Sequence, residues 1–152
     1  MVLLLYEWEL LPGPYLYLSA FFNANREEYL DHLLSVSRDG AWEDWVIFVL
    51  EALETQAWDA YECGEALLSL RNEYRDEYHN AGPVVRELVE FLFERSYITA
   101  TAAIDALDRS QPAVNRALNR LENDGVVEEQ TGNQRHQVWA AQDILTIVEP
   151  RR

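Results

Sequence analysis

Residues 96–140 read SYITATAAIDALDRSQPAVNRALNRLENDGVVEEQTGNQRHQVWA, and this stretch decides the fold of the second half of the chain. Its apolar residues recur at helical spacing, recur again after a tight turn, and end in two short extended runs. The order predicts a helix, a turn, a second helix and a β-hairpin. The first helical face consists of Ile98, Ala102, Ile104 and Leu107, and the second of Val114, Ala117, Leu118 and Leu121.

Turn and capping residues separate these predicted elements. Ser110 occupies the position of a helix N-cap, and Pro112 follows in the first turn, where its missing N–H costs nothing. Gly125 ends the second helical pattern. The extended runs that follow predict a hairpin, or wing, with strands over Val126–Gln130 and His136–Ala140.

The second helix carries amide and guanidinium groups on the face opposite to its apolar stripe. Side chains of this kind, at helical spacing, can reach base edges in the major groove of DNA. We therefore predict that this helix and the wing bind double-stranded DNA. The alternative is that these residues form only a solvated helix face, with ordinary polar residues at the hairpin tip. The predicted DNA-binding residues are Ser110, Gln111, Asn115, Arg116, Asn119, Arg120 and Arg135.

The chain has 152 residues and is 49% hydrophobic, which is typical of a globular protein with one good core or two small ones. Its formal net charge is −15, and every basic residue is an arginine. This balance counts against nucleic-acid binding, because DNA repels a polyanion. The charge is uneven, however: residues 1–82 carry 4 arginines and 16 acidic residues, and residues 83–152 carry 8 arginines and 11 acidic residues.

An acidic chain without lysine resembles proteins of organisms that live in concentrated salt; an ordinary acidic protein is the alternative. Salt matters here because DNA affinity falls with a log–log slope of roughly −0.9 for each neutralised phosphate. A halophilic DNA-binding protein must therefore depend on direct base contacts more than on a broad basic patch. A few arginines and amides on one helix are compatible with that requirement.

The sequence also indicates the setting of the protein. The apolar residues 1–5 are followed by Glu7 and Glu9, without a cleavage site, so we expect neither a signal peptide nor a membrane span. Cys63 is alone and is a predicted half-buried helix residue, with a reactive thiol as the alternative. His32 and His79 have no second metal ligand at helical spacing. We predict a cytoplasmic protein without cofactor or metal.

The chain divides into two predicted domains. Residues 1–80 are a predicted helical bundle, and the run Asn-Ala-Gly-Pro over 80–83 is the clearest boundary. Residues 83–152 begin with a helix at Pro83 and follow the winged helix-turn-helix plan. The expected fold class is mainly α. The predicted helices of the first domain are Val2–Leu11, Tyr15–Phe22, a third from about Asn25 to Asp39, and Trp42–Tyr78; a last turn covers Asp143–Val148.

Three runs of the first domain carry a family resemblance. PYLYLSAFF over residues 14–22, NREEYL over 25–30, and GAWEDW over 40–45 with Phe48 and Glu51 resemble the C-terminal helices of Fic-family (Fido-fold) proteins. In that family these helices follow the catalytic loop, and many members append a winged helix. The resemblance therefore covers nearly the whole chain.

The resemblance implies an AMP-transferring enzyme, but its catalytic motif is absent. Fic proteins use His-Pro-Phe-x-(Asp/Glu)-Gly-Asn-Gly-Arg, with the histidine as general base and the loop holding phosphates. None of the three histidines of this chain precedes such a loop. We therefore carry over no catalytic residue and predict that this chain is not an enzyme.

The first predicted helix, Val2–Leu11, would expose a large apolar surface if it stood alone, which soluble monomers rarely tolerate. We predict that it is buried in a homodimer, which would present two reading helices to a symmetric DNA site. The alternative is a helix folded back on Trp42–Leu70 of the same chain.

The leading hypothesis is thus a sequence-specific DNA-binding protein that regulates transcription. The second is a non-catalytic remnant or regulatory part of a Fic-type enzyme. The third is a module in which the winged helix binds a partner protein.

Overall fold

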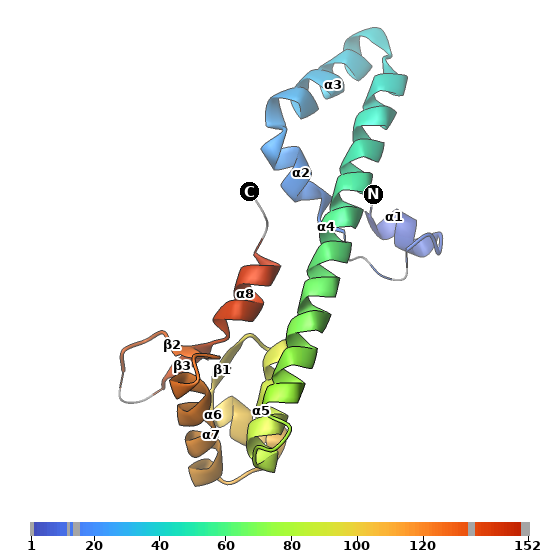
Figure 1. The fold of residues 1–152 in the computed structure, drawn as a ribbon. Coiled ribbons are helices and arrows are strands. Elements are labelled where there is room, and N and C mark those ends of the chain that lie inside the picture. Colours follow the sequence, from blue (N-terminus) through green and yellow to red (C-terminus); the bar gives the residue numbers. More distant parts are fainter. Residues whose placement is uncertain (1, 12, 14–15, 134–135, 150–152) are drawn as a thin grey trace. The chain divides into compact units, whose positions relative to one another are not determined.

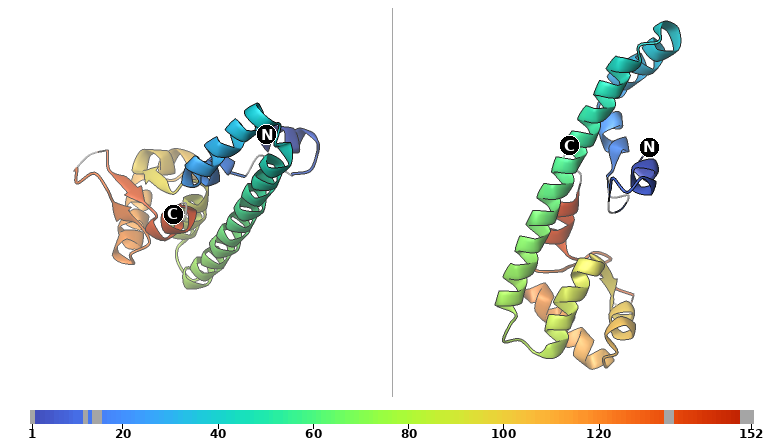
Figure 2. Two further views of the ribbon diagram at one scale, coloured as in Figure 1. Left: turned by 90° about the horizontal axis from the view of Figure 1, so that it is seen from above. Right: turned by 90° about the vertical axis from the view of Figure 1, so that its right-hand side faces the viewer.

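The computed structural model describes residues 2–11, 13, 16–133 and 136–149, and it is mainly helical with one small sheet (Figure 1). The predicted fold class, a helical bundle followed by a winged helix-turn-helix, is confirmed. The chain divides into two compact units, Met1–Gly64 and Glu65–Glu149. The boundary falls within the long helix α4 (Trp42–Glu77), which is uninterrupted (Figure 2). Among the described residues, no helix combines the length and the hydropathy of a bilayer span.

The first unit contains α1 (Val2–Glu7), α2 (Leu18–Ala24), α3 (Arg26–Asp39) and the first part of α4. Gly40 ends α3 with φ at 68°, a left-handed conformation that glycine adopts without strain. The core of this unit is aromatic. Around the buried ring of Phe48 lie the rings of Phe21, Phe22, His32 and Trp45.

Two sequence predictions for this unit need correction. The first helix ends at Glu7 and not at Leu11, because Glu9 takes a left-handed conformation (φ 57°) and the Leu10 N–H donates back to the Leu5 carbonyl at 2.9 Å. Asn25 stands at the N-cap of α3, but it does not cap the helix through its side chain. Its amide donates instead to the Phe21 carbonyl, at 3.0 Å.

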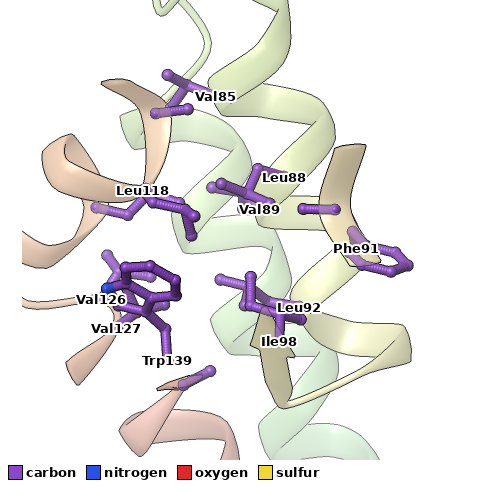
Figure 3. Packing of buried hydrophobic residues seen from close by; sticks show 14 of the residues in the cluster. Val85, Leu88, Val89, Phe91, Leu92, Ile98, Leu118, Val126, Val127 and Trp139 are labelled. Carbon is purple, nitrogen blue, oxygen red and sulfur yellow. The ribbon is translucent and has the colours of Figure 1, made fainter. Parts of the chain in front are cut away.

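The second unit is built around α5 (Pro83–Glu94), which buries Val85, Leu88, Val89, Phe91 and Leu92 on one face. Pro83 starts it, as predicted, at a position where no backbone donor is needed. Figure 3 shows the apolar side chains of α5 directed toward those of the neighbouring elements. The labelled cluster consists of Val85, Leu88, Val89, Phe91, Leu92, Ile98, Leu118, Val126, Val127 and Trp139.

A strand that the sequence analysis missed precedes the helix-turn-helix. Ile98 belongs to β1 (Tyr97–Thr99) and not to the following helix, and it pairs with Trp139 in the antiparallel sheet. The helix α6 (Ala100–Leu107) starts only after Thr99, whose hydroxyl accepts a hydrogen bond from the Ala102 N–H at 3.2 Å. The β-branched residues Ile98 and Thr99 favour the extended strand, and the Thr99 cap starts the helix directly after it.

The sheet has the order β1-β3-β2 and forms the base of the wing. β2 (Glu128–Glu129) and β3 (Val138–Ala140) are shorter than the predicted strands, and both pairs of neighbouring strands are antiparallel. The closing helix α8 (Gln142–Val148) lies next along the chain, close to its predicted range.

The second unit begins inside α4. Tyr74, on the last turn of that helix, and Tyr78, which directly follows it, are almost fully buried in the core that α5 and α7 form. Leu67 and Leu70 pack against the same core. The packing unit therefore starts earlier than residue 83, because the apolar face of α4 continues into it. The assignment of residues 1–80 and 83–152 as domains stays a prediction.

Candidate nucleic-acid interface

The second helix of the helix-turn-helix, α7 (Gln111–Asn123), is fixed in its rotation by a buried face. Val114, Leu118 and Leu121 are fully buried, so the opposite face must point to solvent. Gly125 (φ 82°) closes the helix, and the Val126 N–H donates to the Leu121 carbonyl at 2.8 Å. The exposed positions include all predicted site residues of this helix: Gln111, Asn115, Arg116, Asn119 and Arg120.

Three of these residues lie on one edge of α7, which we call the amide stripe: Gln111, Asn115 and Asn119. The stripe lines an open groove of about 800 Å³. None of the three side chains makes a hydrogen bond with another described residue, so their donors and acceptors are available to a ligand. The groove is completed by the start of α6 and the base of the wing, through Thr99, Ala100, Thr101, His136, Gln137 and Trp139.

The two arginines of α7 lie on a different edge, which we call the arginine edge. Arg116 and Arg120 line a separate hollow together with residues 82–85 at the start of α5. The Arg116 Nε donates to the Pro112 carbonyl at 3.1 Å. The structure thus separates the amides from the guanidinium groups, although the sequence presents them as one polar face.

Arg120 is held by two residues that the sequence analysis did not select. Its guanidinium carbon lies 5.7 Å from the centre of the Tyr78 ring, and its Nε lies 3.5 Å from the Asp124 carboxylate. The Tyr78 hydroxyl donates to the same carboxylate at 3.0 Å. Burial, together with this hydrogen bond, raises the pKa of Tyr78 above its ordinary value of 10.0. At neutral pH the tyrosine is therefore a neutral donor that orients Asp124.

The turn before α7 is tied to α5 by an ion pair. Arg109 donates two hydrogen bonds to the Glu87 carboxylate, at 2.7 and 2.9 Å. Ser110 stands at the predicted N-cap position and is exposed, but its side chain makes no capping hydrogen bond. Its carbonyl instead accepts from the N–H groups of Ala113 and Val114. The Ser110 hydroxyl is therefore not used by the helix.

A carboxylate orders the described part of the wing loop. Glu129 accepts hydrogen bonds from the N–H groups of Thr131 (2.9 Å) and Gly132 (2.7 Å), and also from the Thr131 hydroxyl. The hydrogen bond from the Thr131 side chain lowers the pKa of Glu129. His136 is exposed, with φ at 55°. Arg135, the predicted site residue of the wing, lies outside the described residues.

Acidic residues also lie around the groove, and the structure gives several of them an internal partner. The Trp139 Nε1 donates to Glu122 at 3.5 Å, and the Gln142 amide donates to Glu128 at 2.9 Å. Among the described groove residues there is neither an aspartate, a glutamate nor an arginine. The described lining of the groove thus carries no carboxylate, and the carboxylates of Glu122 and Glu128 accept hydrogen bonds from within the protein.

A comparison with known protein families agrees with this geometry. Residues 84–128 match the family model described as "Winged helix-turn-helix DNA-binding". The matched segment runs from α5 to the first residue of β2 and so includes both helices of the helix-turn-helix. The chain therefore carries a winged helix-turn-helix DNA-binding domain, and the amide stripe lies on the second helix of that motif.

Five residues of this surface do not follow from the sequence pattern: Thr99, Thr101, Gln137, Tyr78 and Asp124. The pattern places Thr99 inside a helix, although a threonine before an apolar helical run is an N-cap signal. Gln137 was not distinguished from the other hairpin residues. Tyr78 and Asp124 are 46 residues apart and no local pattern joins them.

Proposed function

We propose that this protein is a sequence-specific DNA-binding protein that regulates transcription, and that it acts in the cytoplasm without catalysing a reaction. The observation that carries the proposal is the amide stripe, an exposed row of amides on the second helix of a DNA-binding motif, with no hydrogen-bond partner among the described residues. Such amides distinguish base pairs in the major groove, whereas contacts to phosphate alone do not.

The test is a binding titration of the full chain against a library of genomic fragments, by fluorescence anisotropy at several potassium chloride concentrations. We expect a small set of fragments to bind far more tightly than the rest, and the ranking to persist as salt rises. Equal binding of all fragments, or no binding at any salt concentration, would overturn the proposal.

We also propose that the protein is a homodimer through its N-terminal helices. Several large apolar side chains of the first unit are exposed, and Leu3, Trp8, Trp42 and Trp58 are each more than 60% accessible. A second copy of the chain would cover such a surface on both partners at once. The lysine-free, acidic composition supports an interface that forms in concentrated salt, where like charges are screened.

Sedimentation velocity in concentrated salt tests the dimer. The wild-type protein should sediment as a dimer at micromolar concentration, and Leu3→Glu should sediment as a monomer. Ser19→Glu is the matched control, since it adds the same charge at an exposed polar position of α2. A wild-type monomer at all concentrations would exclude this assembly.

A second candidate function is the regulatory part of a Fic-type AMP-transferring enzyme. The support is local: α2, α3 and α4 begin at Leu18, Arg26 and Trp42, inside the three sequence runs that resemble Fic proteins. The genomic reading frame upstream of Met1 decides between the candidates. A continuous frame encoding the His-Pro-Phe…Gly-Asn-Gly-Arg motif would favour the enzyme.

A further inference from the structure

We infer that the amide stripe selects adenine-containing base pairs, and that the arginine edge of α7 contributes phosphate contacts instead of base reading. This inference rests on the proposed function and specifies the class of DNA that the same surface takes. It differs from the grouping that the sequence suggests, in which Arg116 and Asn115 belong to a single reading face.

The first step is the chemistry of the stripe. A side-chain amide offers one acceptor oxygen and two N–H donors. Adenine presents a complementary pair in the major groove, the N7 acceptor and the N6 amino donor, and asparagine or glutamine binds both at once. Guanine presents two acceptors, which suit the two donors of an arginine or the charge of a lysine. No described residue that lines the groove is an arginine or a lysine.

The second step is the spacing of the amides. Gln111, Asn115 and Asn119 are four residues apart, and a helix rises about 1.5 Å per residue, so successive amides are about 6 Å apart along the axis. Base pairs along B-DNA are about 3.4 Å apart. A helix that lies along the groove therefore places neighbouring amides close to two base pairs apart. The stripe predicts adenines at alternate positions of a short site.

The third step is the availability of the amides compared with that of the other polar groups. The stripe has no hydrogen-bond partner among the described residues. Glu122, which could otherwise accept from a cytosine amino group, receives the Trp139 N–H. Arg116 is bonded to the carbonyl of Pro112, on the edge away from the groove. Among the polar side chains that α7 itself contributes to the groove, the groups left to meet base edges are thus the amides.

The fourth step concerns the arginine edge. Arg116 and Arg120 share a hollow with residues 82–85 and do not line the groove of the amide stripe. When α7 presents the amides to bases, these guanidinium groups lie on the flank of the helix, where the phosphates of a major groove run. Their positive charge then adds affinity that depends on salt, whereas the neutral amides add affinity that does not.

The experiment is a selection of bound duplexes from a random pool by the full-length protein, repeated with two variants of adjacent residues. For the wild type we expect enrichment of adenine–thymine pairs, with adenines two positions apart. Asn115→Ala should lose the preference at one position, by about 5- to 150-fold, and keep the salt dependence. Arg116→Ala is the matched control: it should weaken all duplexes alike and reduce the log–log salt slope by about 0.9.

The outcomes separate the inference from the proposed function. A guanine-centred consensus overturns the inference, and so does an unchanged consensus for Asn115→Ala. A consensus that changes at one position with Arg116→Ala also overturns it, because the arginine would then read a base. No binding of any duplex by the wild type overturns the proposed function, and the inference falls with it. Circular dichroism checks that each variant is folded. We expect both to fold, because the side chains of Asn115 and Arg116 are exposed.

Discussion

The guanidinium of Arg109 donates two hydrogen bonds to the Glu87 carboxylate, so that the turn between α6 and α7 is fastened to the middle of α5. The two residues are 22 positions apart, and both are partly exposed. The pair links the turn directly before α7 to α5, one helix away in the same unit. An arginine that the sequence places beside the predicted DNA-binding helix thus has a partner within the protein.

Arg109→Ala should lower the melting temperature slightly and leave the sequence preference of DNA binding unchanged. The effect is small because the pair is exposed to solvent and screened by salt. Melting curves of Arg109→Ala, Glu87→Ala and the double variant check the pair as a thermodynamic cycle. The double variant should be no less stable than either single one, and additive losses would show that the two residues do not interact.

Stability should fall in acid, and Glu90 should contribute to the fall. Arg75, and then Arg71, bind the Glu90 carboxylate and hold its pKa below the ordinary value of 4.5. The unfolded chain then binds more protons than the folded one in acid, so the stabilisation exists above pH 4.5 and disappears as the pH falls through the folded pKa. By urea denaturation, Glu90→Gln should be less stable than the wild type at pH 7, and the difference between the two should narrow as the pH falls below 4.5. Parallel curves at both pH values would contradict this.

A loss of stability is also expected in alkali, from Tyr74. Burial, and then the hydrogen bond to Asp143 at 2.8 Å, raises the pKa of Tyr74 above its ordinary value of 10.0. Unfolded tyrosine releases its proton near pH 10 while the folded side chain keeps it, so stability is complete below pH 10 and is lost as the pH rises further. Tyr74→Phe, compared by denaturation at pH 8 and pH 11, should lose less stability over this interval than the wild type. An equal loss would assign the effect to other tyrosines, with Tyr78→Phe as the first to measure.

The helix-turn-helix could be predicted because its signals are local. The spacing of Val114, Leu118 and Leu121 identifies the buried face of α7, and Gly125 marks its end, where the structure has a left-handed turn. Ile98 misled the prediction because an apolar residue four positions before Ala102 fits a helix equally well. Only the pairing of Ile98 with Trp139, which is 41 positions away, makes it a strand.

The arrangement of the candidate site could be predicted only in part. Consecutive helical residues such as Asn115 and Arg116 differ in direction by a fixed angle, so their separation follows from helix geometry. Which of them faces the wing depends on how α7 packs on α5, and this is set by tertiary contacts. The restraint on Arg120 is of the same kind, because Tyr78 contacts it from the segment that directly follows α4.

The small sheet predicts a sharp loss of stability for Ile98→Ala. Ile98 is 1% exposed, and it lies opposite Trp139 at the centre of the pairing between β1 and β3. Truncation of a buried isoleucine to alanine costs about 2–5 kcal/mol, from lost burial and the cavity that remains. Chemical denaturation measures this loss. Tyr97→Ala is the control, since Tyr97 is in the same strand and is exposed, and it should cost much less.

The contact between Arg120 and Asp124 predicts that DNA binding can be strengthened by removing one negative charge. The carboxylate lies 3.5 Å from the Arg120 Nε and partly neutralises it. Asp124→Asn keeps an oxygen that accepts from the Tyr78 hydroxyl, so the fold of this corner should persist. The variant should bind duplexes of any sequence more tightly at low salt, with a log–log salt slope steeper by up to about 0.9, because the arginine can then neutralise a full phosphate charge.

The matched control for this prediction is Asp31→Asn, which makes the same change in net charge at an exposed position of α3 in the first unit. It should alter neither the affinity nor the salt slope. If both variants bind DNA more tightly to the same degree, the gain reflects the overall charge of the protein and not Arg120. If Asp124→Asn binds no better than the wild type, Arg120 does not contact phosphate. Removal of the Asp124 charge would otherwise strengthen the attraction between Arg120 and the DNA backbone.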